Sequence, residues 1–261
     1  MCAKGADPAP VREPQDAEPV PVSLPEDEAL PILRDAEVIG GRRMLYGSNY
    51  TFLLGLDAGA GKYLRAIYKP RDGERPLYDF PSGTLYKREY AAFLVSRALG
   101  WPDVPLTLLR EGPHGVGVFQ LFVEHDPQVT YFDLVGQHEE TLLGFAVFDI
   151  LVNNADRKGG HCLLGPDGRI WSIDHGLTFH TVFKVRSVMM EFWGAQVPQQ
   201  LVNDLNALRP SLLQSAPLHK ELSELLAPRE IELLCTRLDA LVQDGTIPVL
   251  DPSRNIPWPL V

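Results

Sequence analysis

Polar and apolar residues alternate along most of the first half of the chain, a pattern typical of strands. Runs of this kind cover residues 36–39, 45–56 (with a turn inside), 63–70, 104–110 and 117–123. One helix interrupts them over Leu85–Leu99, because apolar residues recur there at helical spacing and Gly100 follows as a stop. The first half therefore predicts a small antiparallel sheet with a helix packed on it.

The pattern becomes helical after residue 125. Residues 141–153 form the most apolar stretch and read as a buried helix, and further helices are expected over 198–205, 218–226 and 229–242. Two short apolar runs, 162–164 and 170–173, flank a Gly-Pro-Asp-Gly turn and predict a hairpin. The sequence thus predicts an α+β fold, with a β-rich N-lobe over residues 31–124 and a helical C-lobe over residues 125–250 of one domain.

Both ends of the chain differ from this pattern. Residues 1–30 are rich in Pro, Ala, Asp and Glu and have almost no aromatic side chains, so we expect a disordered tail there. The Pro-rich tail over 251–261 is expected to lie against the surface. The start of the chain lacks the apolar segment of a secretory signal, and no apolar run reaches the length of a membrane span.

Composition narrows the classes of partner. The formal net charge is −10, which argues against nucleic acid and anionic membranes, because both attract basic surfaces. Three cysteines without a CxxC motif give neither a disulfide framework nor a structural zinc site. We therefore expect a cytoplasmic protein without stable membrane insertion.

Two acidic residues flank the predicted hairpin of the C-lobe. Asp156 lies in the polar run Asn-Asn-Ala-Asp-Arg-Lys-Gly-Gly-His, and Asp174 lies in Ile-Asp-His-Gly. Phosphoryl transfer uses such a pair, one carboxylate to orient the hydroxyl nucleophile and one to hold Mg²⁺ on the phosphates. Arg157 and Lys158 are then placed to neutralise phosphate charge, and Asn154 to orient the acid. Considered alone, an ordinary Asx-rich turn explains the first motif equally well.

A lysine and a glutamate upstream complete the pattern. Lys69 ends a predicted strand, where its ammonium would hold the phosphates of a nucleotide, and Glu89 on the next helix would position it. By itself Lys69 is better explained as a surface lysine. The order Lys69, Glu89, Asp156, Asp174 across two lobes favours a nucleotide cleft instead.

Other candidates are assigned by position. Ser48 and Asn49 lie in a turn that would cover phosphates, although an ordinary hairpin turn fits equally well. The connector residues Phe122, Val123 and Glu124 would bind adenine through their backbone. Lys184 and Arg186 lie in a segment expected to contact an anionic substrate. The alternative for that segment is a packed loop with solvated charges.

At these motifs the chain resembles the phosphatidylinositol 3-/4-kinase-like branch of the protein-kinase-like superfamily. That branch carries Asp-Arg-x-x-x-Asn and an Asp-Phe-Gly-like motif, and the counterparts here read Asp-Arg-Lys-Gly-Gly-His over 156–161 and Asp-His-Gly over 174–176. The resemblance spans roughly residues 31–250, is strongest to short bacterial, largely actinobacterial, proteins, and extends to HipA-type kinases. It implies a bilobal kinase fold that uses ATP and a divalent metal, with Lys69, Asp156 and Asp174 as functional positions.

His161 is where this chain departs from the family motif, since an asparagine usually binds metal there. Imidazole suits Mg²⁺ less well than an amide oxygen, so His161 is a candidate ligand for a metal such as Mn²⁺ or a hydrogen-bond partner of phosphate. The expected function is an ATP-dependent phosphotransferase acting on a protein Ser/Thr or a small hydroxyl compound. The alternatives are a nucleotide-binding pseudokinase that serves as a regulatory module, which the His161 substitution favours, and a nucleotidyl (AMP) transferase.

Overall fold

The sheet of the first lobe is built around β4 (Lys62–Pro70). The computed structural model describes residues 19–44 and 49–261. β3 (Thr51–Gly59) pairs antiparallel with β4, β6 (Gly115–Leu121) pairs antiparallel with its second half, and β1 (Val20–Val22) pairs parallel with its start. The outer strands are β2 (Val38–Met44) beside β3 and β5 (Thr107–Gly112) beside β6, so the order is β2-β3-β4-β6-β5. Strands are present where they were predicted, but β2 continues to Met44 beyond the predicted end at residue 39, and β3 continues to Gly59 beyond the predicted end at residue 56. Residues 45–48 lie outside the described ranges.

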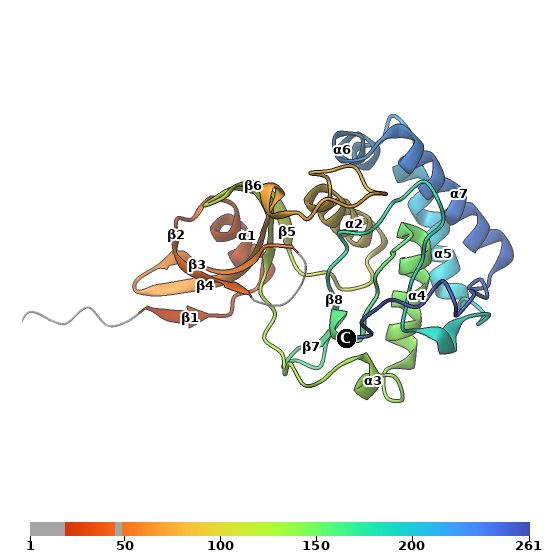
Figure 1. Cartoon of the computed structure of the whole chain (residues 1–261), viewed down its shortest axis with the longest axis horizontal. Helices are drawn as coiled ribbons and strands as arrows, with labels where there is room; N and C mark the ends of the chain where they lie inside the picture. Colours follow the sequence, from red (N-terminus) through yellow and green to blue (C-terminus); the bar gives the residue numbers. More distant parts are fainter. Residues whose placement is uncertain (1–18, 45–48) are drawn as a thin grey trace, which may run out of the picture.

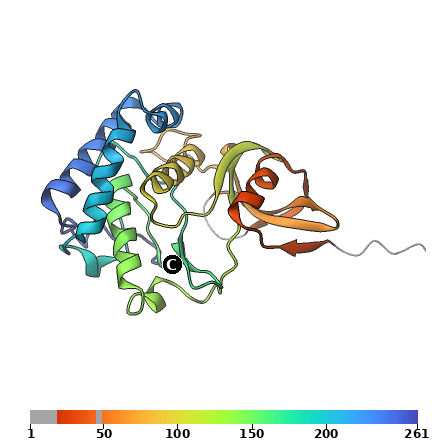
Figure 2. The ribbon, with the colours of Figure 1, turned by 180° about the vertical axis from the view of Figure 1, so that it is seen from behind.

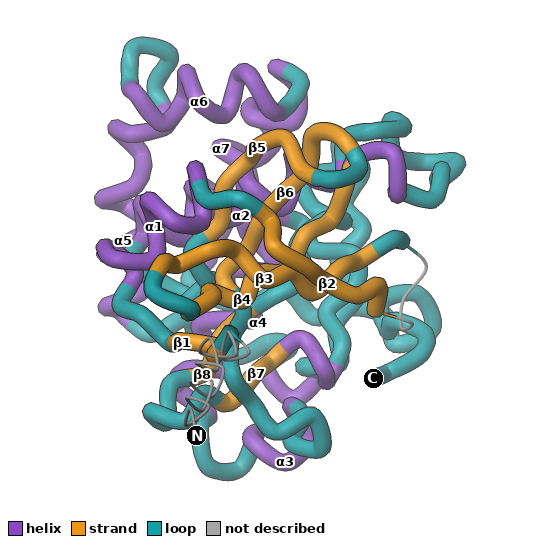
Figure 3. Tube along the Cα trace, turned by 90° about the vertical axis from the view of Figure 1, so that its left-hand side faces the viewer, coloured by secondary structure: helices purple, strands orange, loops and turns teal. Residues whose placement is uncertain are grey.

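Side chains of β4 alternate between the two faces of this sheet. Leu64, Ala66 and Tyr68 are buried in the core of the lobe, and Ile67 and Lys69 face the other way and are half-buried. Successive residues of a strand point to opposite faces, so this register places Lys69 on the face that the core does not cover. Figure 3 views the molecule from the side of this lobe and shows the strands crossing in front of the second lobe.

A helix precedes the sheet in a segment where the sequence predicted a disordered tail. β1 and α1 (Glu26–Asp35) both begin before residue 30, so the tail assignment is corrected for residues 19–30, and residues 1–18 lie outside the described part of the chain. The first turn of α1 carries Glu26, Asp27 and Glu28, whose negative charge is favourable at a helix N-terminus. Ala29 and Leu33 are fully buried against the sheet. A composition averaged over 30 residues hides a helix this short.

The helix α2 (Leu85–Leu99) lies between the two lobes in both views of the ribbon (Figures 1 and 2). Its Phe93 packs in the core of the sheet, while Ala92 and Val95 pack in the core of the helical lobe. The predicted bounds are confirmed, and Gly100 ends the helix with a φ of 82° that favours glycine. Any side chain on the remaining face of α2 is therefore held rigidly at the junction of the lobes.

The second lobe surrounds α4 (Glu139–Val152), which is buried along nearly its whole length. α7 (Pro228–Asp244) packs against α4, while α5 (Gln199–Leu208) and α6 (Pro217–Leu225) pack against α7 and α2. The short α3 (Tyr131–Leu134) lies at one end of the lobe. The predicted hairpin is present as β7 (Cys162–Leu164) and β8 (Ile170–Ser172). Short 3-10 turns complete the lobe as η2 (Gly159–His161), η3 (Met190–Phe192) and η4 (Arg209–Leu212), and η1 (Arg71–Gly73) follows β4 in the first lobe.

The last residues of the chain run along the second lobe. Gly159 N donates to the carbonyl of Leu260 (2.8 Å), and Ser187 N donates to the carbonyl of Asn255 (2.9 Å). This C-terminal segment therefore lies beside the loop that carries Asp156. Across the described residues, none of the helices is both long and apolar enough to span a bilayer.

Candidate active site

A pocket of about 160 Å³ lies between the lobes and collects the main predicted residues. Lys69 enters it from β4, Glu89 from α2, and Asp156 and Asp174 from the two loops that flank the β7–β8 hairpin. Asn49 and Lys158, which were also predicted, line the same pocket. The other lining residues were not predicted as site residues: Tyr50, Thr51, Pro70, Glu74, Leu85, Tyr86, Gly176 and Leu177. The fold thus brings four distant positions of the sequence to one site.

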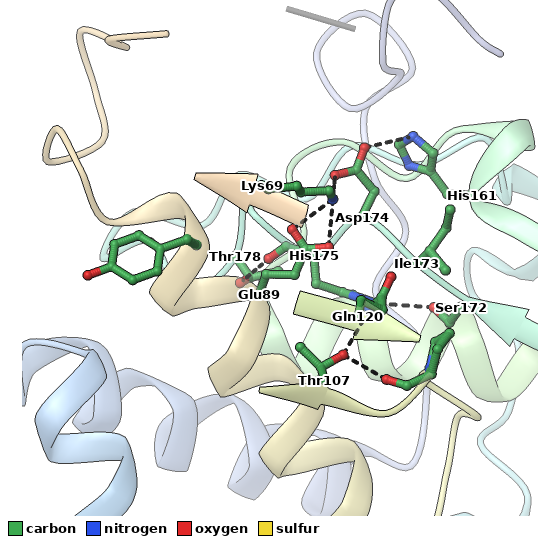
Figure 4. Close-up of polar contacts among 12 residues, drawn as sticks. Lys69, Glu89, Thr107, Gln120, His161, Ser172, Ile173, Asp174, His175 and Thr178 are labelled. Carbon is green, nitrogen blue, oxygen red and sulfur yellow. Dashed lines mark hydrogen bonds and ion pairs between the residues drawn. The ribbon is translucent and has the colours of Figure 1, made fainter. Parts of the chain in front are cut away.

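Lys69 is the centre of this site. Its Nζ donates to Glu89 Oε1 and Oε2 at 2.7 and 2.8 Å and to Asp174 Oδ1 at 3.0 Å (Figure 4). Burial by itself would lower the pKa of Lys69, but the charges of Asp174 and Glu89 outweigh burial and the pKa is raised. One ammonium therefore sits between two carboxylates, which leaves the group with a net negative charge that a divalent cation would neutralise.

Asp174 is held by both lobes. Lys69 contacts its Oδ1, and His161 Nε2 lies 3.2 Å from its Oδ2. The charge of Lys69, together with His161, holds the pKa of Asp174 well below its usual range in spite of burial. The backbone of Asp174 has a φ of 63°, a left-handed conformation that costs energy for a side chain other than glycine and is often found at functional sites. Its side chain is still 46% exposed, so the carboxylate is open to the cleft.

Asp156 lies across the pocket with Lys158, whose Nζ is 3.3 Å from Asp156 Oδ2. Burial and, less strongly, the nearby charge of Asp174 raise the pKa of Asp156 to about 6, against the opposing effect of Lys158 and Arg186. Asn154 does not contact the carboxylate, but its Oδ1 accepts from the backbone N–H of Asp156 at 3.0 Å. It orients the loop rather than the acid itself.

Arg157 does not lie in the pocket, and the prediction that it neutralises phosphate charge is corrected. Its side chain is fully buried and donates to both oxygens of Asp149 on α4, at 2.7 and 2.8 Å. It also reaches the hydroxyl of Ser172 on β8 at 2.8 Å. Arg157 therefore fixes the loop of Asp156 to the core of the second lobe.

Lys184 is also used within the protein. Its ammonium pairs with Asp79, in the loop before α2, and its backbone N–H donates to Asn153 Oδ1 at 2.8 Å. Arg186 differs, because its charge acts on Asp156 across the site. Of the two predicted substrate-binding cations, the structure brings only Arg186 near the predicted catalytic acid.

The predicted nucleotide-binding residues do not all lie in one pocket. Phe122, Val123 and Glu124 line a separate groove with residues of the hairpin turn, and Glu124 pairs with Arg65. Asn49 lines the Lys69 pocket, where its Oδ1 accepts from the N–H of residue 75 at 2.7 Å. Ser48 lies outside the described residues.

Glu74 also supports the site, although it was not predicted. Its Oε1 accepts from the N–H of Tyr86 in the first turn of α2 at 2.8 Å, and burial raises the pKa of its carboxyl. It thereby caps the helix that carries Glu89. Because it lies in an irregular loop well before the helix, no local capping pattern marks it.

Comparison with solved structures defines the class of fold. The Helicobacter pylori proinflammatory kinase CtkA is 14% identical, with a TM-score of 0.52, over 83% of this chain and 95% of that one. Hydra Fam20, solved with sugar, is 17% identical, with a TM-score of 0.54, over 83% of this chain and 86% of that one. The expected α+β, protein-kinase-like fold is confirmed.

Comparison of sequences defines the family. The sequence model of phosphatidylinositol 3- and 4-kinase matches residues 107–222. Protein Rv2133c of Mycobacterium tuberculosis is 36% identical over 273 aligned residues, which cover 91% of this chain and 97% of that protein. The chain belongs to the phosphatidylinositol 3-/4-kinase-like family of the protein-kinase-like superfamily, as the motifs predicted.

Proposed function

We propose that this protein is an ATP-dependent phosphotransferase whose acceptor is a protein Ser/Thr or a small hydroxyl compound. The observation that carries the proposal is the contact of Lys69 with both Glu89 and Asp174, beside Asp156 in one pocket. In phosphoryl transfer, catalysis is almost entirely positioning and charge stabilisation, and these residue types supply both.

The residues present fit a magnesium ion. Asp174 offers a carboxylate oxygen that is open to the cleft. Within residues 19–44 and 49–261, no group of three His, Cys, Asp or Glu side chains is placed to hold a metal by itself. Mg²⁺ is usually bound by one or two carboxylates, with water and substrate phosphates completing its shell. Bound in this way, the ion would neutralise charge on the phosphate oxygens.

The side chains divide the remaining work. Lys69, released from Asp174 and held by Glu89, binds the phosphates of ATP. Asp156 accepts the proton of the acceptor hydroxyl, and its pKa of about 6 leaves it mainly ionised at neutral pH yet basic enough to take a proton. Lys158 and Arg186 offset the negative charge beside it.

Two measurements test this proposal after the protein is incubated with ATP and either Mg²⁺ or Mn²⁺. They are the release of ADP and the intact mass of the protein. We expect metal-dependent ADP release, and a phosphoryl addition of about 80 Da on the protein or on an added acceptor. An adenylyl addition of about 329 Da would instead show nucleotidyl transfer. Nucleotide binding without turnover under both metals would show a pseudokinase.

Asp174→Asn is the loss-of-function variant that tests the site, and it is compared with a control variant at an exposed acid. It removes the proposed metal ligand with little change in shape, so turnover should fall below detection while the melting temperature is kept. Asp239→Asn changes an acid on α7 whose side chain is 63% exposed, away from the pocket, and should leave activity unchanged. Normal metal-dependent turnover by Asp174→Asn would refute the site assignment.

A further inference from the structure

His161 is fixed from its backbone outward. It ends η2, and its carbonyl accepts from the N–H of Ile173 and from Arg157 Nη1, both at 3.1 Å. Ile173 is the residue before Asp174, so the backbone of His161 is tied to the segment that carries the proposed metal ligand. The ring itself is 13% exposed. Its position beside Asp174 is therefore set by the fold rather than by a freely rotating side chain.

The two ring nitrogens face different chemical groups. The backbone N–H of Lys158 points at Nδ1, 3.4 Å away, and Asp174 Oδ2 lies 3.2 Å from Nε2 (Figure 4). An amide N–H only donates, and an ionised carboxylate only accepts. A neutral imidazole satisfies both neighbours in one tautomer, with a bare Nδ1 and a proton on Nε2.

A metal ligand would need the opposite tautomer. If Nε2 gave its lone pair to a cation, the ring proton would move to Nδ1 and meet the N–H of Lys158, so that two donors would face each other. The bond to Asp174 would be lost at the same time. The surroundings of His161 thus favour a hydrogen-bond donor over a ligand.

We propose that His161 is a positioning residue, which donates from Nε2 to Asp174 Oδ2 and orients this carboxylate toward the metal without binding the metal itself. This inference rests on the proposed function. Each carboxylate oxygen has two lone pairs, so Asp174 can bind a cation on its exposed side and keep its bond to His161. Partners that hold a ligating side chain in place are typically worth about 10- to 100-fold in metal affinity.

The tautomer is tested first, without nucleotide. Long-range ¹⁵N–¹H NMR of the full chain, with the His161 signals identified by their loss in His161→Gln, reports which ring nitrogen carries the proton. We expect the Nε2–H form both alone and after addition of Mg²⁺ and ADP. A proton on Nδ1 in either sample overturns the inference. This measurement does not depend on whether the protein has kinase activity.

Metal affinity is tested by calorimetric titration of Mg²⁺ and, separately, Mn²⁺ into protein saturated with ADP. His161→Gln keeps a donor at a similar reach and should remain within about 3-fold of the wild type, whereas His161→Ala should bind about 10-fold more weakly. Both metals should be affected by the same factor. A loss confined to Mn²⁺, which imidazole suits better than Mg²⁺, would show a direct ligand and overturn the inference.

Two further outcomes of the titration would refute a proposal. If His161→Gln is as weak as His161→Ala, a donor at this position does not support metal binding and the inference is refuted. If the wild type binds neither metal with ADP, the proposed function fails and the metal role of His161 fails with it. In that case the NMR result still decides whether the ring donates to Asp174.

Discussion

Two clusters of charged side chains meet at Asp174 and His175, and they differ in how far they are closed. The cleft cluster is Lys69, Glu89, Asp174 and His161. The core cluster is Arg157, Asp149, Ser172 and His175, whose Nε2 lies 3.0 Å from both Arg157 Nη2 and Ser172 Oγ. In the core cluster, the side chains of Arg157 and Asp149 are 0% and 1% exposed. In the cleft cluster, those of Lys69 and Asp174 are 20% and 46% exposed. Neighbouring residues of one short segment thus serve opposite environments.

In the core cluster every side-chain polar atom has a hydrogen-bond partner except His175 Nδ1, which is buried without one. The guanidinium of Arg157 donates to Asp149, to the carbonyls of His161 and Ile173, and to Ser172, at 2.7–3.2 Å. The cleft cluster has one ammonium for two carboxylates and an open side. A closed network stabilises a loop geometry, while an open one can exchange an internal partner for a ligand. We infer that the first cluster holds the site and the second carries its chemistry.

Breaking the core cluster should give the largest effect on folding. Arg157→Ala leaves the carboxylate of Asp149 buried without its cation, although Asn154 Nδ2 still donates to it, and should lower the free energy of unfolding by about 3–5 kcal/mol. Urea denaturation followed by circular dichroism measures this loss. Arg169→Ala is the control, because this side chain on the turn of the β7–β8 hairpin is 49% exposed and its loss should cost well under 1 kcal/mol. Equal losses in the two variants would contradict the distinction between the clusters.

Breaking the cleft cluster should affect turnover more than folding. Lys69→Met removes the proposed phosphate-binding charge, and kcat/KM for ATP should fall by about 10²- to 10³-fold. The unfolding free energy should fall less than in Arg157→Ala, because the carboxyl of Glu89, whose pKa burial already raises, can take up a proton through the open cleft. Steady-state kinetics and urea denaturation on the same preparation check both parts. A stability loss as large as that of Arg157→Ala would show that the cleft cluster is also structural.

The sequence predicted the cleft cluster better than the core cluster, for a physical reason. Lys69 and Glu89 lie on a strand and a helix that the sequence pattern predicts, so their pairing and their place in one cleft with Asp174 could be predicted. The direct contacts of Asp174 with Lys69 and His161 could not. Arg157 is adjacent to Asp156, but the two side chains point to opposite sides of the loop. Nothing in the local pattern distinguishes a loop arginine that faces phosphate from one that faces a buried aspartate.

The other features that were not predicted also lack a local sequence pattern. α1 is short, and its two buried residues, Ala29 and Leu33, are set among acidic residues and prolines, so composition hid it. Glu74 acts on α2 from a loop, and Lys184 meets Asp79 across 105 positions of the sequence. Contacts between irregular segments carry no periodicity, so they could not be predicted from one sequence.

Lowering the pH should abolish turnover at the cleft before it unfolds the protein. The pKa of Asp156 is raised to about 6, so the carboxylate that accepts the hydroxyl proton is lost as the pH falls through that value. The turnover rate should be level above about pH 7 and fall about tenfold per pH unit below about pH 5.5. A pH–rate profile, with circular dichroism at each pH to show that the fold persists, checks this. Asp156→Asn should lose most activity and the acid limb with it; an unchanged limb would assign the titration to another group.

The ion pair of Lys184 with Asp79 is more exposed than the core cluster and less exposed than Asp174 in the cleft. Breaking it should give the smallest loss of stability. Both side chains are less than a fifth exposed, and the pair ties the loop before α2 to the segment after Asp174. Lys184→Ala and Asp79→Ala should each lower the unfolding free energy by about 1 kcal/mol, and the double variant should cost little more, because both remove one interaction. If Lys184 instead binds an anionic acceptor, only its own variant should raise KM for that acceptor. Equal KM values in the two single variants would place this lysine with Arg157, among charges used to hold the site, and leave Arg186 and Lys158 as the cations of the cleft.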